Sequence, residues 1–151
     1  MRRIAKTVGS ILAAFGIAVT TAAVTAAPAN AAVSCSGTKT YDNSSGALGL
    51  GELTIYYNSA DGGTNSACFY HRGSLYGVAA ETYVRIERCV ETSGEGQYCT
   101  PDRSSSPDTG TYKYYAGPRG VTGTANRCVA AVGWVYWGGE YYGISSGRQG
   151  C

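Results

Sequence analysis

The sequence predicts an all-β protein: a small disulfide-stabilised antiparallel β-sandwich or barrel of about six to eight short strands. Residues that favour strands and turns dominate after residue 31, where all 13 Tyr, both Trp and 20 of the 22 Gly lie. Several short stretches there alternate apolar and polar side chains with the period of a strand. All six Cys also follow residue 31, and an even count in an exported chain indicates disulfides.

Residues 1–31 have the pattern of a secretory signal peptide. A cationic start precedes an apolar run from Ile11 to Val24, and Ala29-Asn30-Ala31 then gives the small-x-small pattern that signal peptidase accepts. The alternative is a retained membrane anchor, but the run is rich in Ala and Thr and no positively charged stop-transfer segment follows it. We therefore expect cleavage after Ala31 and a single secreted β domain over residues 32–151.

Cleavage changes the charge balance of the protein. The signal segment holds three of the 12 basic residues and none of the ten acidic ones, so nine basic residues face ten acidic ones in the mature chain. A near-neutral surface without clusters of Lys or Arg argues against nucleic acid or an anionic membrane as partner. We expect an extracellular protein without a cofactor and without a membrane partner after cleavage.

The first half of the mature chain contains one clear hairpin. Glu52 to Tyr57 alternates like a half-buried strand, the Asn-, Asp- and Gly-rich stretch from Asn58 to Asn65 predicts a turn, and Ala67 to Arg72 forms the returning strand. A further strand is expected from Thr82 to Val90, with Val84, Ile86 and Val90 on one face.

The second half has shorter elements. Gln97 to Thr100 predicts a short strand, and the Pro- and Ser-rich stretch from Pro101 to Gly110 predicts a loop. Tyr112 to Ala116 reads as a strand that Gly117-Pro118 closes, because Pro cannot donate to a sheet ladder. Arg127 to Trp137 is the longest apolar strand, and a last short strand begins after the Gly138-Gly139 turn.

Three disulfides are expected from the positions of the cysteines. Cys89 and Cys99 flank a flexible Gly-containing turn, so we expect them to pair. Cys35 and Cys151 lie at the two ends of the mature chain, and a bridge between them would pin both termini. Cys68 and Cys128 then form the third pair. The spacings are too wide for the closely paired ligands of a zinc site, so we expect no metal.

The block Asp108-Thr109-Gly110-Thr111-Tyr112-Lys113-Tyr114-Tyr115-Ala116-Gly117-Pro118 resembles the spore-associated protein A family of actinomycetes. Cys128-Val129, the terminal Cys151 and the strand around Leu53 are also similar to that family. The resemblance implies four shared cysteines, at Cys35, Cys68, Cys128 and Cys151, with Cys89 and Cys99 as an added pair. It also implies secretion and association with the spore or cell surface, and it carries no established chemistry.

No catalytic residue is predicted. His71 is the only histidine, it lies at the end of the first hairpin, and no Gly-x-Ser-x-Gly nucleophile motif accompanies it, so we expect an exposed strand-end histidine. A glycosidase would need two carboxylates at a suitable separation, which a sequence cannot measure. The candidates for such a pair are Glu52, Glu81, Glu87, Glu91 and Glu140.

Binding is the more plausible chemistry, because aromatic residues gather between Trp134 and Tyr142 with glycines among them. Trp134 and Tyr136 share a face with Cys128 and are expected in the core. Trp137 then points outward, and the turn brings Tyr141 or Tyr142 near it. Trp137, Tyr141 and Tyr142 are therefore the candidate ligand-binding residues.

We therefore expect a secreted, non-enzymatic protein of the spore or cell envelope whose candidate partner is a glycan or protein of that surface. Two alternatives are a small secreted hydrolase of glycosidase type and a secreted protease inhibitor. The inhibitor would present either the loop between Cys89 and Cys99 or the stretch through Pro101 and Arg103.

Overall fold

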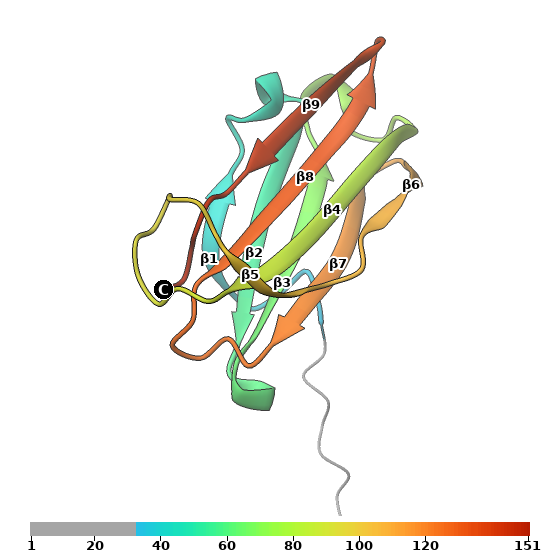
Figure 1. The fold of residues 1–151 in the computed structure, drawn as a ribbon. Helices are drawn as coiled ribbons and strands as arrows, with labels where there is room; N and C mark the ends of the chain where they lie inside the picture. The colour runs from blue at the N-terminus through green and yellow to red at the C-terminus, as the bar shows by residue number, and fades with distance from the viewer. Residues whose placement is uncertain (1–32) are drawn as a thin grey trace, which may run out of the picture.

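A computed structural model describes residues 33–151; the expected signal peptide lies outside these residues. They form two antiparallel sheets that pack face to face as a sandwich (Figure 1). Sheet A has the strand order β1 (Thr38–Asn43), β2 (Gly51–Asn58), β3 (Thr64–His71), β7 (Tyr115–Thr122). Sheet B has the order β5 (Pro101–Ser104), β4 (Ala80–Cys89), β8 (Val129–Trp137), β9 (Glu140–Ser145), and β6 (Asp108–Tyr112) also pairs with β4. Three short 3-10 turns complete the fold: η1 (Ala47–Gly49), η2 (Ala60–Gly62) and η3 (Gly73–Leu75).

The core lies between the two sheets and is centred on Phe69. The Phe69 ring is fully buried, and it fills the space where side chains of Gly51 and Gly133 would stand. A Cβ atom at Gly51 would lie 2.2 Å from the ring, and one at Gly133 would lie 2.4 Å from it. These two glycines therefore permit one large side chain to join the inner faces of both sheets.

The all-β sandwich class is confirmed, and so are the strands with strong alternation. The expected hairpin corresponds to β2 and β3, and Val84 and Ile86 of β4 are both buried on its inner face. Val90 was wrongly placed on that face, because β4 ends at Cys89 and Val90 is exposed. The long apolar strand is β8, and the last strand is β9. The strand β1 was not predicted, because its sequence is mostly polar.

The stretch from Pro101 to Pro118 was predicted wrongly. Pro101 begins the strand β5, and Asp108 begins β6, so the expected loop contains two strands. The expected strand at Tyr112 to Ala116 instead contains the turn between β6 and β7. The strand β7 continues through Pro118 because a register shift opposite β3 takes up this position, and the N–H group of Gly117 donates to Asp108 rather than to the ladder.

The two faces of β8 are also the reverse of the expectation. Val129, Ala131 and Val135 are buried, whereas Trp134 is half-buried and Tyr136 is exposed on the outer face of sheet B. The prediction took the face of Cys128 as the core face. That reasoning fails because Cys128 precedes the strand and forms its bridge at the end of the sheet.

Three disulfides are present, and one of the expected pairs is confirmed: Cys89 with Cys99. The other two expected pairs are wrong, because Cys35 pairs with Cys68 and Cys128 pairs with Cys151. Cys68 alternates with the buried inward residues Ala67 and Phe69, so it lies on the outer side of sheet A, away from sheet B. The N-terminal segment crosses that side, where Cys35 reaches it.

The C-terminal segment reaches Cys128 along the start of β8. Val129 and Gln149 exchange two backbone hydrogen bonds, of 2.9 and 2.7 Å, which places Cys151 beside Cys128. Within residues 33–151 all cysteines are paired, which indicates an oxidising environment outside the cytoplasm. The part of the chain that the structure describes holds no helix that could cross a membrane.

Candidate ligand-binding hollow

A tyrosine-lined hollow lies at one end of the sandwich. It has a volume of about 420 Å³, and we call it the tyrosine hollow. Its walls come from the end of β3, from the segment between η3 and β4, and from the turn that joins β6 to β7 (Figure 1). The residues that line it are Tyr70, Arg72, Tyr76, Tyr114 and Tyr115.

Asp108 holds the β6–β7 hairpin that forms one wall. Its carboxylate accepts hydrogen bonds from the Gly117 N–H at 2.6 Å, from the Tyr112 hydroxyl at 2.9 Å and from Arg119 Nη2 at 3.2 Å. Burial raises the pKa of Asp108, but these donors and the Arg119 charge outweigh it, so its pKa lies below the ordinary value. The carboxylate is therefore charged and fixes the turn that carries Tyr114 and Tyr115.

Backbone hydrogen bonds join this turn to the opposite wall. The His71 N–H donates to the Tyr114 carbonyl at 2.8 Å, and the Gly77 N–H donates to the Lys113 carbonyl at 2.9 Å. As a result Tyr76 and Tyr114, which are distant in sequence, meet edge to face with ring centroids 5.3 Å apart. Both rings remain exposed, with 64% and 51% of their surface accessible. The hollow is thus formed before any ligand arrives.

Arg72 is held in position at the edge of the hollow. Its Nε atom donates to the buried carboxylate of Glu52 at 2.7 Å, and the other Glu52 oxygen accepts from the Thr54 hydroxyl at 3.1 Å. The guanidinium carbon lies 5.0 Å from the centroid of the Tyr70 ring, within the range of a cation–π contact. The hydrogen bond with Glu52 raises the pKa of Arg72, so the cation is permanent.

The hydroxyl groups of Tyr70 and Tyr56 lie 3.0 Å apart and share a hydrogen bond. Burial raises the pKa of Tyr70, and the hydrogen bond with Tyr56 raises it further. Tyr70 also contacts Tyr115, with ring centroids 5.6 Å apart. The Tyr70 phenol is therefore neutral, and its hydroxyl can donate or accept hydrogen bonds beside the ring faces that line the hollow.

A second hollow of about 310 Å³ adjoins the first and shares Tyr114 and Tyr115 with it. Its remaining lining residues are Tyr112, Lys113 and Gly117. The same hairpin turn therefore presents ring surface to two neighbouring depressions, one beside Arg72 and one beside Lys113.

The expectation for His71 is wrong: it is fully buried rather than exposed. His71 continues the inward alternation of Ala67 and Phe69, so its ring lies between the sheets. Nε2 is 2.7 Å from the Thr82 hydroxyl, and Nδ1 is 3.2 Å from the Val78 carbonyl oxygen. Burial lowers the pKa of His71, while backbone carbonyls partly offset the effect. The neutral ring joins β3 to β4 and supports the segment that carries Tyr76.

The predicted ligand-binding residues do not form one platform. Tyr141 is exposed on the outer face of sheet B, where its ring contacts Trp134 and Tyr136. Tyr142 points inward and packs partly against the core, with its hydroxyl donating to Glu140 at 3.2 Å. Trp137 is 39% exposed near the tip of the β8–β9 hairpin. Alternation along β9 separates Tyr141 from Tyr142.

Sequence reasoning missed the tyrosine hollow. The signal was present in the run Tyr112-Lys113-Tyr114-Tyr115, but this run was interpreted as one regular strand. The partner residues Tyr70, Arg72 and Tyr76 lie about forty positions earlier. The pairing of β3 with β7 and the backbone hydrogen bond from Gly77 to Lys113 bring them to the turn.

The glutamates considered for a glycosidase pair have partners of other kinds. Glu52 binds Arg72, Glu87 binds Arg85, and Glu140 accepts from the Tyr142 hydroxyl. Glu91 accepts the backbone N–H of Thr100. Glu81 is exposed on β4, beside Tyr136 of β8. These contacts give most of the carboxylates a role in holding the fold.

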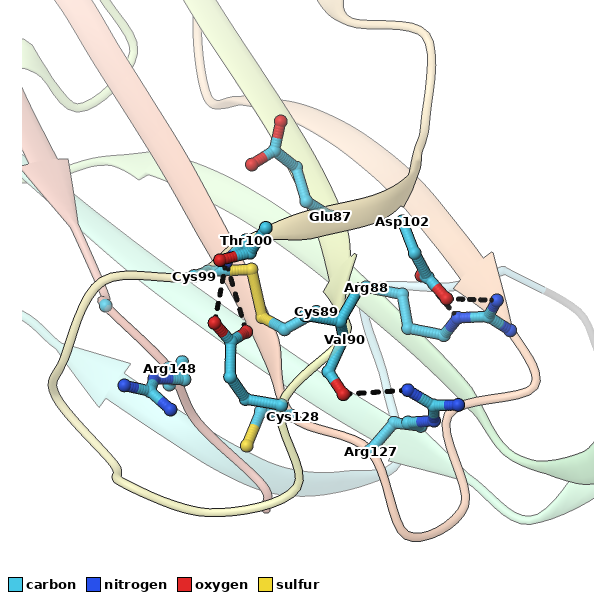
Figure 2. The surroundings of a disulfide bond; sticks show 12 residues. Glu87, Arg88, Cys89, Val90, Cys99, Thr100, Asp102, Arg127, Cys128 and Arg148 are labelled. Carbon is cyan, nitrogen blue, oxygen red and sulfur yellow. Dashed lines mark hydrogen bonds and ion pairs between the residues drawn. A yellow bond between two sulfur atoms is a disulfide. The ribbon is translucent and has the colours of Figure 1, made fainter.

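The region considered for an inhibitory loop lies along the edge of sheet B. Figure 2 shows the Cys89–Cys99 disulfide there, with Arg88 beside Asp102. Arg88 donates twice to the Asp102 carboxylate, at 2.8 Å each, and Arg103 donates to the Thr122 hydroxyl at 2.9 Å. The stretch through Pro101 and Arg103 is thus anchored by β4 and by its own side chains, which does not favour a projecting inhibitory loop.

The sulfur atoms of Cys89 and Cys99 and the carboxylate of Glu91 lie within 4.8 Å of one another. Metal binding at cysteine requires a thiolate, and both sulfurs are bonded to each other. The two sulfur atoms therefore form a disulfide, and the neighbouring Glu91 carboxylate accepts the backbone N–H of Thr100. Hydrogen bonding by Thr100 lowers the pKa of Glu91.

No protein-family model, curated protein or solved structure matches this chain.

Proposed function

We propose that this protein is a secreted, non-enzymatic component of the spore or cell envelope and that it binds a glycan in the tyrosine hollow. The observation that supports this proposal is the preformed concave site that four tyrosines and a fixed guanidinium line together. The association with the spore surface comes from the resemblance of the Tyr112 to Pro118 block, and the disulfides agree with export.

Tyrosine suits a saccharide better than most residues do. A sugar ring has an apolar face of C–H groups and a rim of hydroxyls, so it needs flat apolar surface and hydrogen-bonding groups together. Tyr70, Tyr76 and Tyr114 provide both from a rigid frame, and each loses little side-chain entropy on binding. The volume of about 420 Å³ lies in the range of small-ligand sites.

The test is retention of the exported protein on purified cell wall, with Tyr114→Ala as the main variant. We expect retention to fall about five- to a hundredfold, by analogy with the stacking of a nucleobase on an aromatic side chain, which contributes on the order of 1–3 kcal/mol. Thermal stability should change little, since the Tyr114 ring is half exposed.

Tyr98→Ala is the matched control, because Tyr98 is a more exposed tyrosine far from the hollow in the loop between Cys89 and Cys99. It should keep full retention. If Tyr114→Ala keeps retention while Trp137→Ala or Tyr141→Ala loses it, the site lies on the β8–β9 hairpin instead. If wall material retains none of the proteins, glycan binding is refuted.

A further inference from the structure

Lys113 differs from every other Lys and Arg side chain in residues 33–151. Within this range it is the one basic side chain that forms no hydrogen bond or ion pair with the protein. The others are engaged by protein acceptors: Lys39 by Asp42, Arg72 by Glu52, Arg85 by Glu87, Arg88 by Asp102, Arg103 by Thr122, Arg119 by Asp108, Arg127 by Val90 and Arg148 by Ser93.

Lys113 lines the second hollow together with Tyr112, Tyr114 and Tyr115, and its side chain is exposed. Lys113 does not belong to a generally basic protein, because the chain after residue 31 carries nine basic and ten acidic residues. A cation that the fold leaves unpaired, next to exposed ring faces, is available to a ligand.

Arg72 supplies a second cationic group on the other side of Tyr114 and Tyr115. Glu52 engages its Nε atom, and Nη1 donates weakly, at 3.4 Å, to the carbonyl of its neighbour His71. Nη2 has no protein partner among the described residues, and 38% of the side chain is exposed. Because Glu52 and Tyr70 fix the guanidinium, its free edge is already oriented for an anion.

We infer that the ligand of the two hollows is an acidic saccharide, with its anionic group bound by Lys113 and its sugar rings placed on the tyrosines. This inference rests on the proposed function and names its ligand class. A carboxylate or a phosphate on the sugar would provide the same negative charge, so the experiment includes both. Neutral sugars would leave the Lys113 ammonium without a partner.

The experiment measures the affinity of the exported protein for three oligosaccharides of equal length by calorimetry: a neutral hexose oligomer, its uronic acid counterpart and its phosphorylated counterpart. A polyglutamate peptide of equal charge is the fourth probe. We expect at least one acidic saccharide to bind more tightly than the neutral one, and high salt to remove the difference, because the Debye length falls to about 3 Å at 1 M.

Lys113→Gln should weaken binding of the acidic saccharide about three- to fivefold, as expected for a solvent-exposed ion pair, and leave neutral binding unchanged. Lys113→Arg should restore the preference for the acid. Lys39→Gln is the matched control, because Lys39 is the other lysine of the described residues and lies on β1, paired with Asp42.

Equal affinity for neutral and acidic saccharides, or equal loss in both on Lys113→Gln, would overturn this inference while the proposed function stands. Equally tight binding of polyglutamate, with the same dependence on Lys113, would overturn the saccharide assignment. Failure of all saccharides to bind would refute the proposed function itself.

Discussion

The sandwich carries two aromatic clusters, one on the outer face of sheet B and one in the tyrosine hollow at its end, and they use their rings in different ways. On sheet B, Tyr83 and Trp134 stack in parallel with centroids 5.2 Å apart, and Tyr141 sets its edge against Trp134 at 4.9 Å. Tyr83, Trp134, Tyr136 and Tyr141 form this aromatic strip. Its rings cover one another, whereas the rings of the tyrosine hollow surround open space.

The difference follows from where the residues lie in the chain. Tyr83 and Trp134 are directly opposite on neighbouring strands, and Tyr136 is opposite Tyr141, so the sheet brings the rings into mutual contact. Tyr76 and Tyr114 instead come from two segments outside regular strands, which meet at the end of the sandwich. A cluster on adjacent strands stabilises the sheet, and a cluster on converging turns can form a site.

The largest effect is expected where one side chain fixes the wall of the hollow. Asp108→Ala removes the acceptor of the Gly117 N–H, the Tyr112 hydroxyl and Arg119, and should cost about 2–3 kcal/mol of stability because hydrogen bonds to a charged group are strong. Glycan binding should fall with it, measured on protein shown to be folded by circular dichroism.

Asp42→Ala is the control for this variant, since Asp42 forms an exposed pair with Lys39 and should leave the unfolding midpoint almost unchanged. If Asp108→Ala unfolds no more easily than Asp42→Ala, the hairpin does not depend on the carboxylate, and the Asp108 hydrogen bonds do not preorganise the hollow.

Trp134→Ala should have the next largest effect, and on stability alone. It removes the stacking with Tyr83 and the edge contact with Tyr141, each of which contributes about 0.5–1.5 kcal/mol, so a loss of about 1–3 kcal/mol is expected in urea unfolding. Affinity for glycan per folded molecule should not change, because Trp134 lines neither of the two hollows.

Trp137→Ala is the comparison for that variant, because Trp137 lies on the same strand but is more exposed and near the hairpin tip. It should cost less stability than Trp134→Ala. A loss of glycan binding in either variant would show that the strip or the hairpin tip contributes to the site, and the contrast between the two faces would fail.

The sequence predicted the fold class well because alternation in β2, β3 and β4 is a local property that burial enforces. The faces of β8 could not be assigned locally, because both faces are apolar. The empty place at Gly133 is filled by Phe69 from the other sheet, which no local pattern shows. Two of the three predicted disulfides were wrong for a related reason: the pairing depends on which side of sheet A Cys68 faces, and this follows from the register with β2.

The candidate site was predictable in kind but not in place. Exposed aromatic residues were expected as the ligand-binding surface, and the density of rings near the C-terminus predicted that surface on β8 and β9. The tyrosines of the hollow belong to β3, the η3 segment and the β6–β7 turn. Their meeting depends on backbone hydrogen bonds between segments, such as those of His71 with Tyr114 and of Gly77 with Lys113.

The smallest expected effect is a pH dependence of stability caused by His71. This buried residue supports the segment that carries Tyr76, and the aromatic strip of sheet B contains no titratable group of this kind. The folded protein lowers the pKa of His71 below its ordinary value of 6.5 through burial. In the unfolded chain the imidazole takes up a proton more readily, so acid favours unfolding. The contribution of the neutral ring is fully present above pH 6.5 and declines as the pH falls below that value.

The measurement is the thermal midpoint between pH 5.5 and 7.5. This is the only histidine of the chain, and the carboxylates have much lower ordinary pKa values, so the slope in this window reports on His71. His71→Gln keeps a polar side chain that can face Thr82 and Val78 but does not titrate, so its midpoint should be lower and nearly constant across the window. An equal slope in both proteins would show that the buried ring is not the titrating group. If acid weakens binding in the native protein and not in His71→Gln, the support of the Tyr76 segment by His71 extends to the hollow.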